Sequence, residues 1–93
     1  MEPARLVVLV SGNGSNLQAI LDACRSGELP AQVGAVFSDQ RQAYGLERAR
    51  LAGVPAFYRP KVRQQDRRDY DRELAEQVFA CRPDWVVLAG WMR

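Results

Sequence analysis

The residues of this sequence best suited to chemistry lie in one short run, Ser11 to Asn16, where two glycines alternate with small polar residues. Gly12 and Gly14 supply the backbone freedom of a tight turn, and their amides can approach an anion closely. Ser15 and Gln18 fit a capping box, which predicts that a helix begins at Ser15. Because the free amides and positive dipole end of that helix would face the turn, the run predicts a phosphate-binding site.

The same turn is open to two other interpretations. A dinucleotide-binding fingerprint needs a third glycine where this chain has Leu17. However, Asp39 follows Gly14 by roughly the interval at which dinucleotide enzymes keep their ribose carboxylate, which leaves NAD binding open. Alternatively, the glycines form only the turn of an α/β unit, and Asp39 is an ordinary loop residue. A mononucleotide or phosphate-ester site, a NAD site and a structural turn all remain open on these residues.

Composition restricts the chemistry and the partners. The 93 residues contain no histidine, so the commonest general base and metal ligand is missing. A net charge of +2 is too small to indicate nucleic-acid or anionic-membrane binding. Cys24 and Cys81 are expected as reduced packing residues on helices, which favours a cytoplasmic protein. The charged amino terminus and its short apolar run predict neither a signal peptide nor a membrane span.

Strands and helices are predicted to alternate along the chain. Strands are expected at 6–10, 32–38, 54–58 and 84–89, and the first and last have the continuous apolar character of strands buried on both faces. Helices are expected from Ser15 to just before Gly27, from 43 to 52, and from an N-cap at Asp66 to Cys81. Pro55 places the third strand at the rim of the sheet.

This alternation predicts a single α/β domain over residues 1–93, with a Rossmann-like, three-layer parallel sheet of four strands and three helices. The expected strand order is 3-2-1-4. Ligands of such sheets bind beyond the carboxyl ends of the strands, where the strand order reverses. The crevice would therefore lie between the first and fourth strands, and it would bring 12–16 beside 90–93.

Five blocks of the sequence resemble the amino-terminal half of the folate-dependent glycinamide ribonucleotide formyltransferases of purine biosynthesis. Related methionyl-tRNA formyltransferases and formyltetrahydrofolate hydrolases share the fold but not the Ser-Gly-Asn-Gly-Ser-Asn run. The resemblance covers essentially the whole chain, in blocks at 10–18, 35–38, 45–49, 70–74 and 87–93.

The resemblance implies roles for individual positions. Gly14, Ser15 and Asn16 would contact the phosphate of glycinamide ribonucleotide, in agreement with the anion argument. Arg67, Met92 and Arg93 would border the site of the cosubstrate 10-formyltetrahydrofolate. Arg67 is also expected in the first helical turn, where a cation opposes the helix dipole. The family transfers a formyl group to an amine through a tetrahedral intermediate, without a metal.

The sequence departs from the family pattern in one respect. The family's catalytic asparagine and histidine, in an Asn-Ile-His-Pro-Ser run, and its later aspartate are missing, so no catalytic residue is assigned. We therefore expect 1–93 to be a substrate-binding half-domain without the carboxy-terminal catalytic half, inactive alone. A shortened chain, a broken reading frame or a proteolytic fragment would each explain this. A free-standing phosphate- or nucleotide-binding module and a small NAD-binding domain are the alternatives, and strand 86–88 is expected to offer an apolar edge for self-association.

Overall fold

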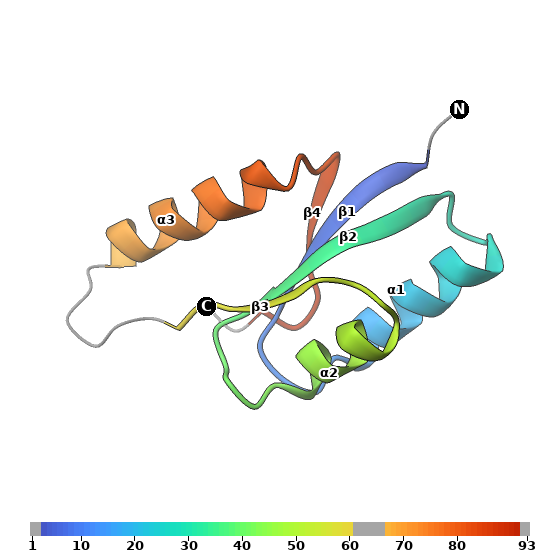
Figure 1. Cartoon of the computed structure of the whole chain (residues 1–93), viewed down its shortest axis with the longest axis horizontal. Coiled ribbons are helices and arrows are strands. Elements are labelled where there is room, and N and C mark those ends of the chain that lie inside the picture. The colour runs from blue at the N-terminus through green and yellow to red at the C-terminus, as the bar shows by residue number, and fades with distance from the viewer. Residues whose placement is uncertain (1–2, 61–66, 92–93) are drawn as a thin grey trace.

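A central strand followed by a glycine turn is the first unit of the fold. In the computed structural model, which describes residues 3–60 and 67–91, strands and helices alternate as predicted (Figure 1). The elements are β1 (Ala4–Val10), α1 (Ser15–Ser26), β2 (Ala31–Ser38), α2 (Tyr44–Leu51), β3 (Ala56–Tyr58), α3 (Arg67–Ala80) and β4 (Trp85–Leu88). The predicted α/β architecture is confirmed.

The four strands form one parallel sheet in the order β3-β2-β1-β4, which confirms the predicted order and the rim position of β3. β1 pairs with β2 from Ala4↔Ala31 to Val10↔Ser38, with one irregularity between Leu6 and Val7. On its other side β1 pairs with β4. β1 is therefore an inner strand, and the turn that follows it lies at the middle of the carboxyl edge of the sheet.

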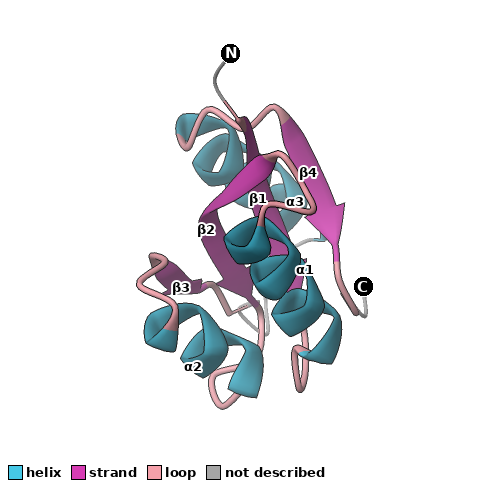
Figure 2. Ribbon diagram, turned by 90° about the vertical axis from the view of Figure 1, so that its right-hand side faces the viewer, coloured by secondary structure: helices cyan, strands magenta, loops and turns pink. Residues whose placement is uncertain are grey.

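The sheet is the middle of three layers. Helices α1 and α2 cover one face, and α3 lies over the other (Figure 2). The side chains of β1 alternate between the two resulting cores: Val8 and Val10 pack with the α1 and α2 side, whereas Val7 and Leu9 pack with α3. Each helix turns one apolar face toward the sheet, because its apolar residues recur at helical spacing. The buried residues on these faces are Leu17 and Leu21 from α1, Leu46 and Ala49 from α2, and Tyr70, Leu74 and Val78 from α3.

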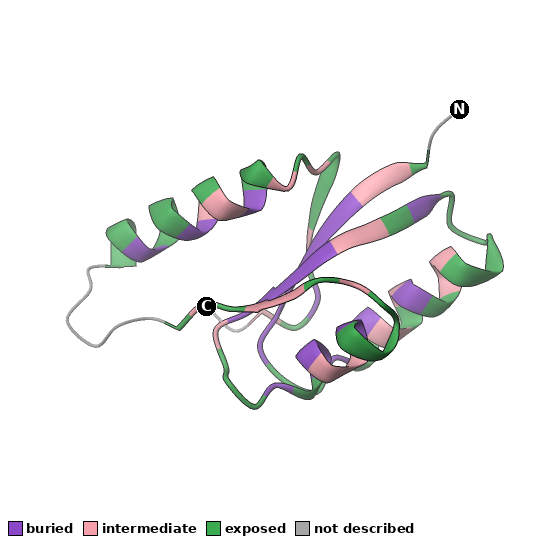
Figure 3. Ribbon diagram, in the orientation of Figure 1, coloured by how far each residue is buried: buried purple, intermediate pink, exposed green. Residues whose placement is uncertain are grey.

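β4 differs from the expectation of a strand buried on both faces. Trp85 is 67% exposed and Leu88 63% exposed, and most of the strand is coloured as exposed in Figure 3. Within the described ranges, only β1 pairs with β4 in the sheet, and the buried face of α3 packs with residues of β1 and β2. The prediction of two-sided burial from the apolar run was wrong for β4, because such a run does not reveal whether neighbouring elements cover it. The exposure of Val86 and Leu88 on an outer strand agrees instead with the expected apolar edge at 86–88.

The helix ends follow local sequence signals. α1 ends at Gly27, which has a left-handed φ of 86° and donates its N–H to Cys24 O. Gly53, with φ of 75°, follows α2, and α3 ends at Ala80, ahead of Pro83. The predicted N-cap Asp66 lies outside the described residues.

Candidate functional site

The predicted phosphate turn leaves the buried carboxyl end of β1 and leads directly into α1. Gly14 has φ of 83° and caps the helix, and its carbonyl oxygen accepts the Gln18 N–H at 2.8 Å. The helix begins at Ser15 as predicted, but the capping box was wrong because Gly14 is the N-cap. The side chain of Gln18 turns elsewhere: it donates to Asp22 Oδ1 at 3.0 Å and accepts from Arg48 Nη1 at 3.2 Å.

The first turn of α1 presents polar side chains to solvent. Ser15 and Asn16 are exposed, and their side chains make no hydrogen bond to any residue that the structure describes. The first turn carries no acidic residue, so no carboxylate opposes an anion there. Hydroxyl and amide donors beside free helix amides form an arrangement that can hold a phosphate group.

Gly14 is the sterically constrained glycine of the turn. A Cβ atom there would lie 2.6 Å from Gly45 Cα of α2 and 3.2 Å from Arg48 Cδ, in addition to its unfavourable positive φ. A Cβ at Gly12 would meet no atom within 4 Å. The requirement for glycine at position 14 therefore comes from the backbone conformation and from the close approach of α2.

The start of α2 holds the turn in place. The Gly45 N–H donates to Gly12 O at 3.1 Å. Arg48 Nε donates to Asn13 O at 2.8 Å, and Arg48 Nη2 donates to Asn13 Oδ1 at 2.8 Å. Arg48 lies in the 45–49 block of the sequence, but no local pattern pairs it with Asn13, which is 35 positions earlier.

Asp39 joins the ends of β1 and β2. Its Oδ1 atom accepts a hydrogen bond from Ser11 Oγ at 3.0 Å. Asp39 is thus held against the first residue of the glycine turn, which gives it a structural role. Its proposed contact with a ribose of NAD stays a prediction.

The predicted folate side lies in the other helical layer. Arg67 begins the described part of α3, with Nε 4.0 Å from Asp71 Oδ2, and both side chains are mostly exposed. They border a cavity of about 440 Å³ between α3 and β4. The remaining lining is apolar: Leu9, Leu74, Ala75, Val78, Phe79, Val86, Leu88 and Trp91. Met92 and Arg93 lie outside the described residues, although the preceding Trp91 lines this cavity.

The structure therefore groups the predicted site residues in two places. Gly14, Ser15 and Asn16 are consecutive at the start of α1, whereas Arg67 begins α3. Figure 2 shows that α1 and α3 lie on opposite faces of the sheet. No turn residue lines the cavity bordered by Arg67. Both groups occupy the carboxyl side of the sheet because α1 and α3 each begin after the carboxyl end of a parallel strand.

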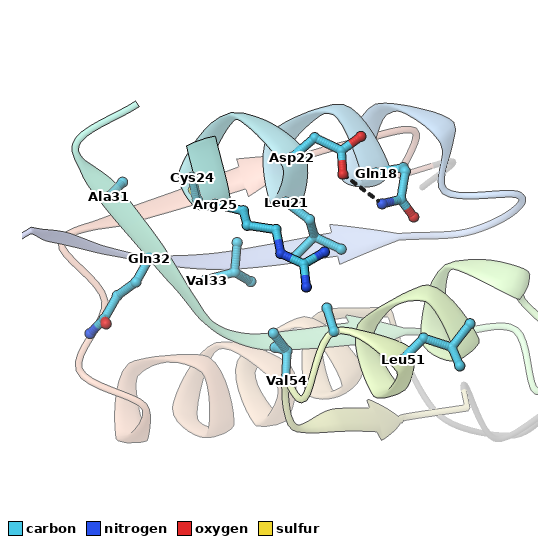
Figure 4. A pocket seen from close by; sticks show the side chains of 11 residues that line it. Gln18, Leu21, Asp22, Cys24, Arg25, Ala31, Gln32, Val33, Leu51 and Val54 are labelled. Carbon is cyan, nitrogen blue, oxygen red and sulfur yellow. Dashed lines mark hydrogen bonds between the residues drawn. The ribbon is translucent and has the colours of Figure 1, made fainter. Parts of the chain in front are cut away.

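Another cavity, of about 320 Å³, lies between α1, the start of β2 and the connection from α2 to β3 (Figure 4). Figure 4 shows the Arg25 side chain extending from α1 into this cavity. Burial raises the pKa of the Cys24 thiol, so this lining cysteine stays protonated and weakly nucleophilic at neutral pH. Because the cavity borders the amino end of β2, it is distant from the edge at which parallel sheets bind ligands.

Two further properties concern ions and membranes. Within 3–60 and 67–91, no three His, Cys, Asp or Glu side chains are placed to share a metal ion. No helix in the same ranges has both the length and the apolar character required to cross a bilayer.

Comparison with known proteins identifies the class. Residues 4–93 match the formyl transferase family, and the chain belongs to that family. The phosphoribosylglycinamide formyltransferase of Escherichia coli K12 is 51% identical over 88 residues, which are 95% of this chain and 42% of the relative. The enzyme of the same name from Schizosaccharomyces pombe is 48% identical over 101 residues, covering 96% of this chain and 47% of the relative.

Solved structures agree with this assignment. Glycinamide ribonucleotide transformylase 1 from Symbiobacterium toebii superimposes with a TM-score of 0.94 at 50% identity, over 98% of this chain and 43% of that protein. A formyltetrahydrofolate deformylase from Pseudomonas putida shares the fold, with a TM-score of 0.85 at 24% identity. The chain spans about half the length of the curated relatives it matches.

The cap assignment leads to a test of stability. A serine N-cap replaced by alanine costs about 1 kcal/mol, but Ser15 is not the cap, so Ser15→Ala should change the free energy of unfolding by less than ~0.5 kcal/mol. Ser38→Ala is the positive control, because the buried Ser38 hydroxyl accepts the Gln40 N–H at 3.1 Å. It should cost about 1 kcal/mol in urea unfolding. An equal loss in both variants would reinstate Ser15 as the cap.

Proposed function

We propose that this chain is the substrate-binding part of a phosphoribosylglycinamide formyltransferase, which transfers a formyl group from 10-formyltetrahydrofolate to glycinamide ribonucleotide in purine biosynthesis. The observation that carries the proposal is the match of residues 4–93 to the formyl transferase family. It is supported by two phosphoribosylglycinamide formyltransferases that are 51% and 48% identical to this chain. We also propose that the enzyme is cytoplasmic, because its two cysteines are free, as expected in a reducing compartment.

In this proposal the glycine turn holds the phosphate of glycinamide ribonucleotide. The backbone amides at Gly14, Ser15 and Asn16, the exposed side chains of Ser15 and Asn16, and the positive end of α1 all favour an anion. Binding the phosphate there would leave the amine of the glycinamide group extended along the carboxyl edge of the sheet.

The groove between α3 and β4 is the proposed folate side. Its apolar lining suits a flat ring system, and Arg67 at its border suits a carboxylate of the folate tail. Met92 and Arg93 follow Trp91 in the sequence, so we include them in this side of the site. The cosubstrate supplies the formyl group, and the groove residues bind and orient it.

The chemical step requires groups that we do not assign to these 93 residues. Formyl transfer needs a base for the amine proton and a donor or cation for the developing oxyanion. The sequence contains no histidine, and three of its acids pair with arginines on exposed helix faces: Glu47, Asp69 and Asp71. We therefore propose that 1–93 is the amino-terminal binding half and that a carboxy-terminal half carries the catalytic residues.

The phosphate proposal is tested by Gly14→Val, which should abolish calorimetric binding of glycinamide ribonucleotide. The new side chain would resist the positive φ and collide with Gly45 Cα. Since that variant can also unfold the turn, Ser15→Ala provides a milder change and should weaken binding about fivefold through one lost hydrogen bond. Ser26→Ala, at the opposite end of α1, is the matched control.

Unchanged affinity in both Gly14→Val and Ser15→Ala would refute the phosphate site. Thermal stabilisation by several ligands separates the alternatives. Stabilisation by glycinamide ribonucleotide supports the proposal, stabilisation by unrelated nucleotides favours a general nucleotide-binding module, and stabilisation by NAD favours the dinucleotide interpretation of Asp39.

The folate proposal is tested in a chain completed with the second half of a full-length relative. Arg67→Ala and Arg93→Ala should each weaken binding of a 10-formyltetrahydrofolate analogue about tenfold, because each removes a charged donor, and should affect the ribonucleotide less. Arg72→Ala is the control, since Arg72 lies on the same helix and pairs with Asp69 in solvent. A larger loss of ribonucleotide affinity would assign the arginine to the other substrate.

We also propose that the 93-residue chain self-associates through β4 and has no transformylase activity. Trp85, Val86 and Leu88 are exposed on an outer strand, and an apolar strand edge favours pairing with a second copy. Light scattering should show a mass above the monomer, which Leu88→Lys lowers and Leu51→Lys, at an exposed leucine of α2, does not. A monomer at high concentration, or measurable formyl transfer, would contradict the corresponding part of this proposal.

A further inference from the structure

We infer that Arg48 is a positioning residue for phosphate binding: it fixes the peptide groups of the glycine turn so that their N–H groups face the ligand. The inference rests on the proposed function, because the ligand is the phosphate of that proposal. It concerns a residue of α2 that is distant in sequence from the turn and is not among the proposed ligand-contacting residues.

The guanidinium group of Arg48 is bonded on several sides. Its Nε and Nη2 atoms make a two-point contact with Asn13, to the backbone oxygen at 2.8 Å and to Oδ1 at 2.8 Å. Its Nη1 atom donates to Gln18 Oε1 at 3.2 Å, and its Cζ atom lies 4.7 Å from the centre of the Tyr44 ring. A planar guanidinium held by three acceptor atoms and an aromatic ring has a defined orientation.

The orientation of the turn follows from peptide geometry. The described chain contains no cis peptide bond, and in a trans peptide the C=O and the next N–H point in opposite directions. Gly12 O is bonded to Gly45 N, so the Asn13 N–H points away from α2. Asn13 O is bonded to Arg48 Nε, so the Gly14 N–H points away from α2 as well.

The side away from α2 is the side on which we place the ligand. α2 packs against β2 and β3, whereas β4 lies on the other side of β1. Two successive N–H groups of the turn therefore point away from α2, and we infer that they face the side of β1 on which β4 lies, where the strand order reverses. They add to the free amides at the start of α1, which face the same end of the sheet.

Glycine makes this external support necessary. The peptide units that flank Gly12 and Gly14 can rotate at little cost, because glycine tolerates conformations that other residues avoid. A rotated Asn13–Gly14 peptide would present its carbonyl oxygen to the phosphate in place of an N–H, and would repel it. Lysine cannot replace the two-point contact of Arg48 with Asn13, since its ammonium group lacks the planar arrangement of donors.

The experiment compares Arg48→Met, Arg48→Lys and the control Arg50→Met in the 93-residue chain. Met keeps much of the aliphatic stem but removes the donors, and Arg50 is an exposed arginine of the same helix that pairs with Glu47. Affinity for glycinamide ribonucleotide is measured by calorimetry below the melting temperature of every variant. We expect a loss of about tenfold or more for Arg48→Met, partial recovery for Arg48→Lys, and no change for Arg50→Met.

A second measurement reports orientation and not only folding. Addition of glycinamide ribonucleotide to the ¹⁵N-labelled chain should shift the Asn13 and Gly14 amide resonances in the native protein and in Arg50→Met. The shifts should be much smaller in Arg48→Met. Ethylguanidinium at millimolar concentration should restore glycinamide ribonucleotide binding to Arg48→Ala, but it should not restore binding to Gly14→Val. A loss of binding caused only by general destabilisation would not be restored in this way.

The outcomes separate the role of Arg48 from the phosphate site itself. Native binding together with unchanged affinity and unchanged amide shifts in Arg48→Met would overturn this inference and leave the phosphate proposal standing. Absence of binding to the native chain would overturn the proposed function, and the inference with it.

Discussion

Burial of β1 on both faces is the constraint on which the rest of the structure depends. Val7, Val8 and Val10 are completely buried, and their side chains point alternately into the two cores. A strand in that position has no face for water, so its backbone groups must be paired by neighbouring strands, and β2 and β4 provide this pairing. The turn after Val10 therefore starts from a rigid point at the centre of the sheet.

The glycine turn owes its shape to the close approach of α2. Gly14 and Gly45 have no side chains, and any Cβ on Gly14 would lie 2.6 Å from Gly45 Cα. A Cβ on Gly45 would in turn lie 2.8 Å from Val10 Cγ2. This closeness allows α2 to satisfy the carbonyl groups of the turn from one side, which leaves N–H groups for the other. The anion site that we propose relies on the direction of backbone dipoles, and so it needs no large net positive charge.

The sheet separates the two regions that we propose as ligand sites. The glycine turn belongs to the layer of α1 and α2, and the groove beside Arg67 belongs to the layer of α3. In the proposed arrangement, the two substrates would meet beyond the carboxyl edge of the sheet. The chain spans 42% of one relative and 47% of another, which is why our proposal assigns the groups that complete this place to the rest of a full-length protein.

The sequence by itself determined the order and type of the elements, the strand order and the position of the glycine turn. The elements and the turn depend on local patterns, such as the apolar run that ends at Val10, the helical spacing of Leu17 and Leu21, and the helix-ending Gly27. The strand order was instead expected from the alternation of strands and helices over the whole chain. The family motifs could also be recognised in the sequence, because each motif is a contiguous run of residues. The capping box was a local pattern that failed, since Gly14 already supplied the cap and Gln18 found partners in Asp22 and Arg48.

Only the tertiary structure decided how these elements act on one another. Arg48 meets Asn13 because the order of β2 and β1 brings α2 beside the start of α1, and no local spacing encodes a contact across 35 residues. The exposure of Trp85 and Leu88 was likewise decided by where α3 packs, not by the apolar character of β4. Hydrophobic patterning specifies which residues avoid water, but the neighbours that cover them and the donors that orient a turn depend on packing between distant segments.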